Sequence, residues 1–103
     1  MIRRRRFADV ISRQLDLFER EHAGLIRDCE TAEQAYDRAS RDEAEERYGH
    51  YIDLVETGTD LLAELRDNYA ASLDEEAAED YVQAFNRTVL RRLPRFAVEI
   101  ESS

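Results

Sequence analysis

The sequence is poor in residues that break helices and in residues that build covalent frameworks. Its 103 residues include three glycines and one proline, too few for the many turns of an all-β sandwich or barrel. Cys29 is the one cysteine, so no disulfide can form within the chain, and we expect a reducing, cytoplasmic location. No apolar run approaches the roughly 20 residues that a membrane-spanning helix needs.

Lysine and tryptophan are also missing, and all fifteen basic residues are arginine. Arginine codons are rich in GC and lysine codons are rich in AT, which favours a high-GC bacterial genome as the source. Charged residues make up 38% of the chain and hydrophobic residues 43%, with a net charge of −9. This acidic, strongly charged composition is typical of a single solvated helical domain.

The first forty residues carry an unbroken pattern of apolar and small side chains, spaced alternately by four and three residues. Its members are Ile11, Leu15, Phe18, His22, Leu25, Cys29, Ala32, Tyr36 and Ala39. A repeat of 3.5 residues is typical of a helix that packs in a coiled-coil-like seam. The spacing therefore predicts one long helix over about residues 7–39.

A second ladder with the same spacing predicts a helix over about residues 42–70. It comprises Ala44, Tyr48, Tyr51, Val55, Gly58, Leu62, Leu65 and Tyr69. Ser40 and Glu43 have the form of a capping box, which favours a turn there. Folding the chain at that turn gives an antiparallel hairpin in which Leu25 lies near Gly58.

Two features of the hairpin leave alternatives open. Thr31 and Gln34 also have capping-box form and would end the first helix near Asp28, although the ladder continues through them without a change of phase. Gly58 lies inside the second helix, where glycine costs about 1 kcal/mol relative to alanine. We interpret Gly58 as a site of close helix approach, with a local kink as the alternative.

A third helix is predicted over about residues 73–93. Ser72 and Glu75 form a capping box at its start, and Pro94 stops it. At about 1.5 Å per residue it is shorter than the hairpin and should cover only part of the seam. In the tail, residues 94–103, apolar and other residues alternate over 96–101 in a strand-like way, and we expect this tail to lie in a groove.

The predicted fold is therefore all-α: a long antiparallel hairpin plus a shorter C-terminal helix, forming one domain over residues 7–93. Several apolar residues lie off the ladders and still need cover, namely Val10, Leu17, Ile26, Ile52, Leu54 and Leu61. The third helix can cover some of them. The others favour a partner, of which a symmetric homodimer forming a larger helical bundle is the commonest kind.

Glu19 and His22 form a Glu-x-x-His pattern, half of the motif with which ferritin-like bundles hold two metal ions. Side chains three residues apart on a helix converge, so a carboxylate and an imidazole can share an ion. A complete site also needs carboxylates from facing helices or from a second copy. We take His22 as a polar residue of the seam, with Glu19 and His22 as metal ligands in the alternative, and we assign no cofactor.

Residues 1–6 form a basic arm through Arg3, Arg4, Arg5 and Arg6, whereas residues 7–86 carry a net charge of −15. Basic tails often contact nucleic acid, but the acidic body would repel the same polyanion. We therefore expect the arm to neutralise acidic residues of its own or a neighbouring copy. An acidic patch on a protein partner, or nucleic acid or a membrane surface, is the alternative target of these four arginines.

The sequence contains no glycine-rich phosphate loop, no nucleophile–base pair, no Cys/His cluster and no calcium loop. Cys29 is flanked by Asp28 and Glu30, whose negative charges raise the pKa of a thiol and disfavour a reactive thiolate. We therefore expect a non-enzymatic interaction or adaptor protein. A ferritin-like metal-binding protein and a regulator that contacts nucleic acid are the alternatives.

Overall fold

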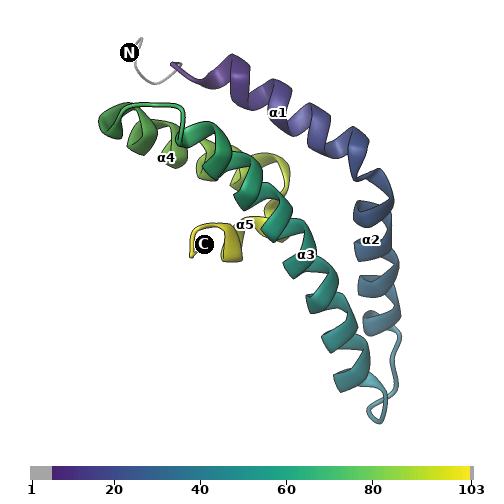
Figure 1. Ribbon diagram of the computed structural model, residues 1–103. Helices are drawn as coiled ribbons and strands as arrows, with labels where there is room; N and C mark the ends of the chain where they lie inside the picture. The colour runs from purple at the N-terminus through teal and green to yellow at the C-terminus, as the bar shows by residue number, and fades with distance from the viewer. Residues whose placement is uncertain (1–5, 103) are drawn as a thin grey trace.

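The computed structural model describes residues 6–102, and the elements it forms there are all helical (Figure 1). They are α1 (Ala8–Glu21), α2 (Ala23–Asp37), α3 (Ala44–Ala70), α4 (Glu75–Arg92), the 3-10 turn η2 (Pro94–Phe96) and α5 (Ala97–Ile100). The all-α prediction is confirmed for this part of the chain. None of these helices combines the length and the apolar character that a bilayer crossing requires.

Helices α2 and α3 lie side by side and antiparallel, joined by the loop over residues 38–43 (Figure 1). The predicted turn at Ser40 is therefore confirmed, and the alternative turn at Thr31 is wrong because α2 continues to Asp37. Near the loop the rings of Tyr36 and Tyr48 lie 5.2 Å apart. This contact agrees with the side-chain register that the two ladders predict for this end of the hairpin.

The predicted capping boxes are wrong in detail. The side chain of Ser40 does not cap α3; only its backbone N–H donates to Glu43 Oε1, at 3.5 Å. Ser72 does not cap α4, because its hydroxyl donates instead to the carbonyl of Tyr69 at 2.6 Å. The cap is Asp74, in extended conformation, whose Oδ1 accepts from the Ala77 N–H at 2.9 Å. Helix α4 therefore begins at Glu75 rather than at residue 73.

The single helix predicted over residues 7–39 is also wrong, because the chain bends at His22, between α1 and α2. Figure 1 shows α1 turning away from the line of α2. The backbone of α1 approaches those of α3 and α4 at few positions, and its contacts with α4 are made by side chains. Aromatic side chains cause the separation, because Tyr81 of α4 reaches Phe7 and Gln14 on one side and Tyr69 of α3 on the other.

The tail is helical rather than strand-like, and this corrects the alternating pattern expected over residues 96–101. Its Phe96 is buried, with its ring 6.1 Å from that of Phe18 in α1. The other side of the ring lies against Gly58 of α3, where a Cβ would overlap ring atoms. Gly58 thus does mark a close approach, but the group that fills it is Phe96 and not Leu25.

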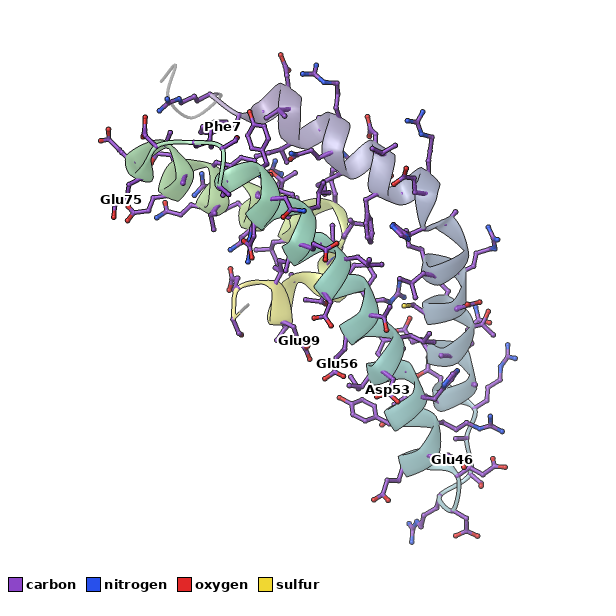
Figure 2. All side chains as sticks on the ribbon, in the orientation of Figure 1. Phe7, Glu46, Asp53, Glu56, Glu75 and Glu99 are labelled. Atoms are coloured by element: carbon purple, nitrogen blue, oxygen red, sulfur yellow. The ribbon has the colours of Figure 1, made fainter. Side chains whose placement is uncertain are left out.

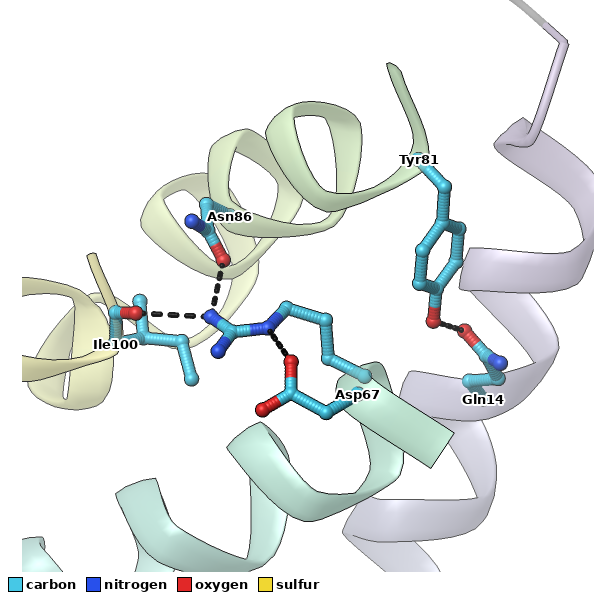
Figure 3. Close-up of polar contacts among 6 residues, drawn as sticks. Gln14, Asp67, Tyr81, Asn86 and Ile100 are labelled. Carbon is cyan, nitrogen blue, oxygen red and sulfur yellow. Dashed lines mark hydrogen bonds and ion pairs between the residues drawn. The ribbon is translucent and has the colours of Figure 1, made fainter. Parts of the chain in front are cut away.

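One buried arginine fastens the tail to the rest of the molecule (Figure 3). Arg66 of α3 is 3% exposed, and its Nη1 donates to the carbonyl of Ile100 at 2.9 Å and to Asn86 Oδ1 of α4 at 3.1 Å. Its Nε donates to Asp67 Oδ1 at 2.8 Å. Buried charges are stable only when they are paired and hydrogen-bonded, and this guanidinium joins α3, α4 and α5.

The molecule is elongated, with principal extents of 51 × 24 × 23 Å. The α2–α3 hairpin forms one end and is only two helices thick, so little of it is fully buried. The core lies in the other part, where α1, α3, α4 and the tail meet; its largest fully buried side chains include Tyr81, Phe85, Phe96, Ile11 and Leu15. Helix α4, the third helix predicted from the sequence, therefore packs between α1 and α3 and does not lie across the outside of the predicted hairpin.

Candidate partner-binding groove

Each of the two candidate metal ligands has another contact in the structure. Glu19 Oε2 lies 3.2 Å from Nη2 of Arg92, in an ion pair between α1 and α4. The ring of His22 packs against that of Phe18, with centroids 5.1 Å apart. Within residues 6–102, no group of three or more His, Cys, Asp or Glu side chains lies close enough together to hold a metal ion. Glu19 therefore contributes to the contact between α1 and α4.

The basic arm is represented by its last residue only, because Arg3, Arg4 and Arg5 lie outside the described residues. Arg6 is exposed, and its Nη1 lies 3.9 Å from Asp80 Oδ2 of α4. Arg6 thus lies beside an acidic group of its own chain, and the target of the arm as a whole stays a prediction. An exposed pair of this kind contributes little to stability, about 0–1 kcal/mol.

Cys29 is fully buried on α2. Burial raises the pKa of its thiol, and the neighbouring carboxylates of Asp28 and Glu30 raise it further, whereas Arg95 acts in the opposite direction. A neutral, inaccessible thiol is a poor nucleophile and a poor metal ligand. The side chain therefore acts as a small apolar residue between α2 and α3, as the flanking acids predict.

A groove of about 200 Å³ runs between α1 and α3, where the two ladders predict direct contact. Its walls are antiparallel helices. Helix α1 contributes Gln14, Leu17, Phe18, Glu21 and His22, and α3 contributes Leu61, Glu64, Leu65 and Asn68. The leucines and Phe18 make the groove apolar along its middle, and polar side chains stand at its margins.

The groove remains partly exposed because nothing among the described residues fills it. Leu17 is 41% exposed, and Leu61 and Leu65 are each half-buried. An exposed leucine alone needs no explanation. Three leucines that face one another across a hollow between two helices form a patch of the kind that partner-binding surfaces use.

Polar contacts hold α1 against α4 and so keep the groove open. The hydroxyl of Tyr81 donates to Gln14 Oε1 at 2.8 Å (Figure 3). Nη2 of Arg92, near the end of α4, donates to Asp16 Oδ1 at 2.8 Å and also contacts Glu19. Gln14, Asp16 and Glu19 of α1 make these contacts with α4. A movement of α1 onto α3 would break them.

A larger hollow of about 490 Å³ lies where the tail meets α2 and α3. Arg95 dominates it: Nη2 contacts Glu33 Oε1 at 2.8 Å, and Nε donates to the hydroxyl of Tyr51 at 3.2 Å. Burial opposes the charge, but these two partners hold the pKa of Arg95 above its ordinary value. Glu33 and Tyr51 of this hollow are thus engaged in binding Arg95 of the tail, and we take the α1–α3 groove as the stronger candidate site because its leucines remain partly exposed.

Part of this groove is recognisable from the sequence. Leu17 and Leu61 lie off the heptad ladders and are among the apolar residues that still need cover. The ladders predict one straight helix over about residues 7–39 that contacts α3 directly. They therefore indicate no polar side chains around Leu17 and Leu61. In the structure Leu17 and Glu21 of α1 and Glu64 of α3 line the same hollow.

The chain matches no known protein-family model, no curated protein and no solved structure. The groove itself is therefore the basis on which a function is assigned to the chain.

Proposed function

We propose that the protein is a small, non-enzymatic interaction or adaptor protein that binds one helix of a protein partner between α1 and α3. The observation that carries this proposal is the apolar hollow lined by Leu17, Leu61 and Leu65, held open by the contacts of α1 with α4. A third helix laid along two antiparallel helices would cover these leucines in the way that bundle helices cover one another. Helix-in-groove docking is a common mode of peptide recognition.

The size of the groove suggests a weak, reversible complex. Stable interfaces bury about 800 Å² on each partner, and a hollow of about 200 Å³ admits only a few anchoring side chains. Interfaces below that size are typical of transient contacts. Such a complex suits an adaptor that exchanges partners in the cytoplasm, the location that the single cysteine suggests.

The experiment that tests this function uses an uncharged amphipathic peptide of about 18 residues, with leucines on one face and glutamines on the other. Leucine methyl NMR signals of the full chain are recorded during the titration. We expect the signals of Leu17, Leu61 and Leu65 to shift, because an entering apolar side chain packs against these methyl groups. Leu90, which is 55% exposed on the outer face of α4, is the matched control leucine.

A Leu17→Gln variant should lose those shifts and a Leu90→Gln variant should keep them. If millimolar peptide moves no groove leucine, or moves Leu90 as strongly, then the groove is not a helix-binding site and the proposal is wrong.

The homodimer expected from the sequence stays a prediction. If two copies associate, we expect them to use exposed apolar residues outside the groove, such as Leu90 and Val98, which are 55% and 82% exposed. The metal and nucleic-acid alternatives receive less support. Glu19 is engaged by Arg92 and Arg6 lies beside Asp80, so each of these two residues has a partner within the chain.

A further inference from the structure

The charges at the margins of the groove indicate what kind of partner helix binds there. Glu21 of α1 and Glu64 of α3 are both exposed and both line it. Within residues 6–102 neither carboxylate forms an ion pair. The two arginines of α1, Arg13 and Arg20, are exposed and do not line the groove. The lining therefore carries two negative charges and no arginine.

The two carboxylates stand at different levels of the groove. Because α1 and α3 run antiparallel, Glu21 and His22 at the end of α1 lie toward Leu61, nearer the α2 side, and Glu64 lies further along, beside Leu65. The opposite end is lined by the amides of Gln14 and Asn68. With Glu21 at one end, Glu64 near the apolar middle and two amides at the other end, the surface is directional, and a docked helix has one preferred direction.

We propose that the partner helix is amphipathic and basic, with an apolar anchor between Leu17 and Leu65 and a lysine or arginine placed to meet Glu21 and Glu64. This inference rests on the proposed function and adds the chemistry of the partner. Opposite charges across an interface steer association and reject wrong partners. The body of the chain supports the same choice, because residues 7–86 carry a net charge of −15 and so favour the approach of a cation.

The same charges argue against a second copy of this groove as the occupant. A symmetric pairing of two grooves would bring both copies of Glu21 and Glu64 into one interface, with no arginine of either lining to neutralise them. Like charges that face each other across an interface oppose association. The groove is thus suited to a different, basic segment.

The test compares two fluorescein-labelled peptides of about 18 residues that share one leucine face, one with lysine and one with glutamate on the flanks. Anisotropy is measured with the full chain at 150 mM NaCl. We expect the basic peptide to bind at least about tenfold more tightly than the acidic one. In Glu21→Arg/Glu64→Arg the preference should reverse.

Net charge alone would also attract a basic peptide, so a matched control is needed. Asp53 and Glu46, labelled in Figure 2, are exposed on the half of α3 nearer the loop and far from the groove. The variant Glu46→Arg/Asp53→Arg has the same net charge as Glu21→Arg/Glu64→Arg. It should keep the affinity for the basic peptide within about threefold. Equal loss of affinity in both double variants would show that only net charge is recognised, and the inference would be overturned.

The two proposals fail in different ways. If both peptides bind the wild-type chain equally and Leu17→Gln abolishes both complexes, the groove is a helix site without charge preference. The inference is then wrong and the proposed function stands. If neither peptide binds and the uncharged peptide shifts no groove leucine, the proposed function is wrong and this inference falls with it.

Discussion

At the scale of single residues, the packing of the tail depends on the absence of one side chain. The ring of Phe96 is buried between Gly58 and Phe18. A methyl group at residue 58 would overlap the ring, so the ring would have to shift from its present position beside Phe18. Gly58 therefore carries a packing role strong enough to offset the cost of glycine inside a helix.

We predict that Gly58→Ala lowers the free energy of unfolding by about 1–3 kcal/mol, the usual cost of overpacking a core. Helix propensity alone would raise stability by about 1 kcal/mol, so the sign of the effect identifies the clash. Gly49→Ala is the matched control on the same helix, because a Cβ there meets nothing within 4 Å and should stabilise. Urea denaturation measures both; equal stability of the two variants would contradict the packing role of Gly58.

Arg66 shows what a heptad ladder cannot reveal. It lies one position after Leu65 and outside the heptad ladder, so the ladder favours an exposed side chain at this position. In the structure it is buried because the tail folds back over it and supplies the Ile100 carbonyl as an acceptor. The acceptor is 34 residues away in the chain, and no local spacing indicates such a contact.

At the scale of helices, the sequence predicted where the helices lie along the chain better than which helices pack against one another. Periodicity identifies α3 within a few residues and places the turn near Ser40 correctly, because both depend on local patterns. It does not say which helix covers which face. The bend at His22 follows from α4 and Phe96 packing between α1 and α3, which is a tertiary effect, so neither the bend nor the groove that it opens was predictable from spacing alone.

The contact of α1 with α4 gives a prediction about pH. Tyr81 is fully buried, and burial raises the pKa of its hydroxyl to about 12 from an ordinary 10.0. Since the pKa is higher in the folded chain, the stabilisation is complete below pH 10 and is lost as the pH rises from 10 to 12. The loss amounts to about 2 kcal/mol by pH 12.

The variant Tyr81→Phe isolates this effect, because the other tyrosines titrate equally in both proteins. At pH 7 we expect it to be about 1 kcal/mol less stable than the wild type, through loss of the hydrogen bond to Gln14. Above pH 10 the difference should shrink and then change sign. Denaturation curves at pH 7, 10 and 11.5 measure it, and a difference that stays constant with pH would show that Tyr81 is not held neutral by burial.

At the scale of the whole molecule, the apolar residues of the groove could be recognised from the sequence, whereas its charged residues could not. The uncovered leucines at positions 17 and 61 were recognisable from the sequence, because they fall outside a repeat that accounts for most of the other apolar residues. Glu21 and Glu64 were not, since they are two of 24 acidic residues and only the fold brings them to the same hollow. The partner's charge is thus a property of the folded chain.

The segregation of charge gives the last prediction, which concerns salt. Residues 7–86 carry a net charge of −15, and self-repulsion of this kind destabilises a compact state. Raising NaCl from 10 to 500 mM shortens the screening length from about 30 Å to a few ångströms. We therefore expect the free energy of unfolding to rise by about 1 kcal/mol, which for a chain of this size raises the Tm by roughly 4–8 °C.

Thermal denaturation followed by circular dichroism at 222 nm measures this shift, and sorbitol at matched osmolality controls for effects of solute that do not depend on charge. The opposing contribution comes from attractive pairs, chiefly those of Arg92 and Arg95 with carboxylates of α1 and α2. Salt weakens these pairs too, but each is partly exposed and contributes about 1 kcal/mol or less. A Tm that falls with added salt would show that the arginine pairs outweigh the repulsion, and that α1 and the tail are held by charge rather than by Tyr81 and Phe96.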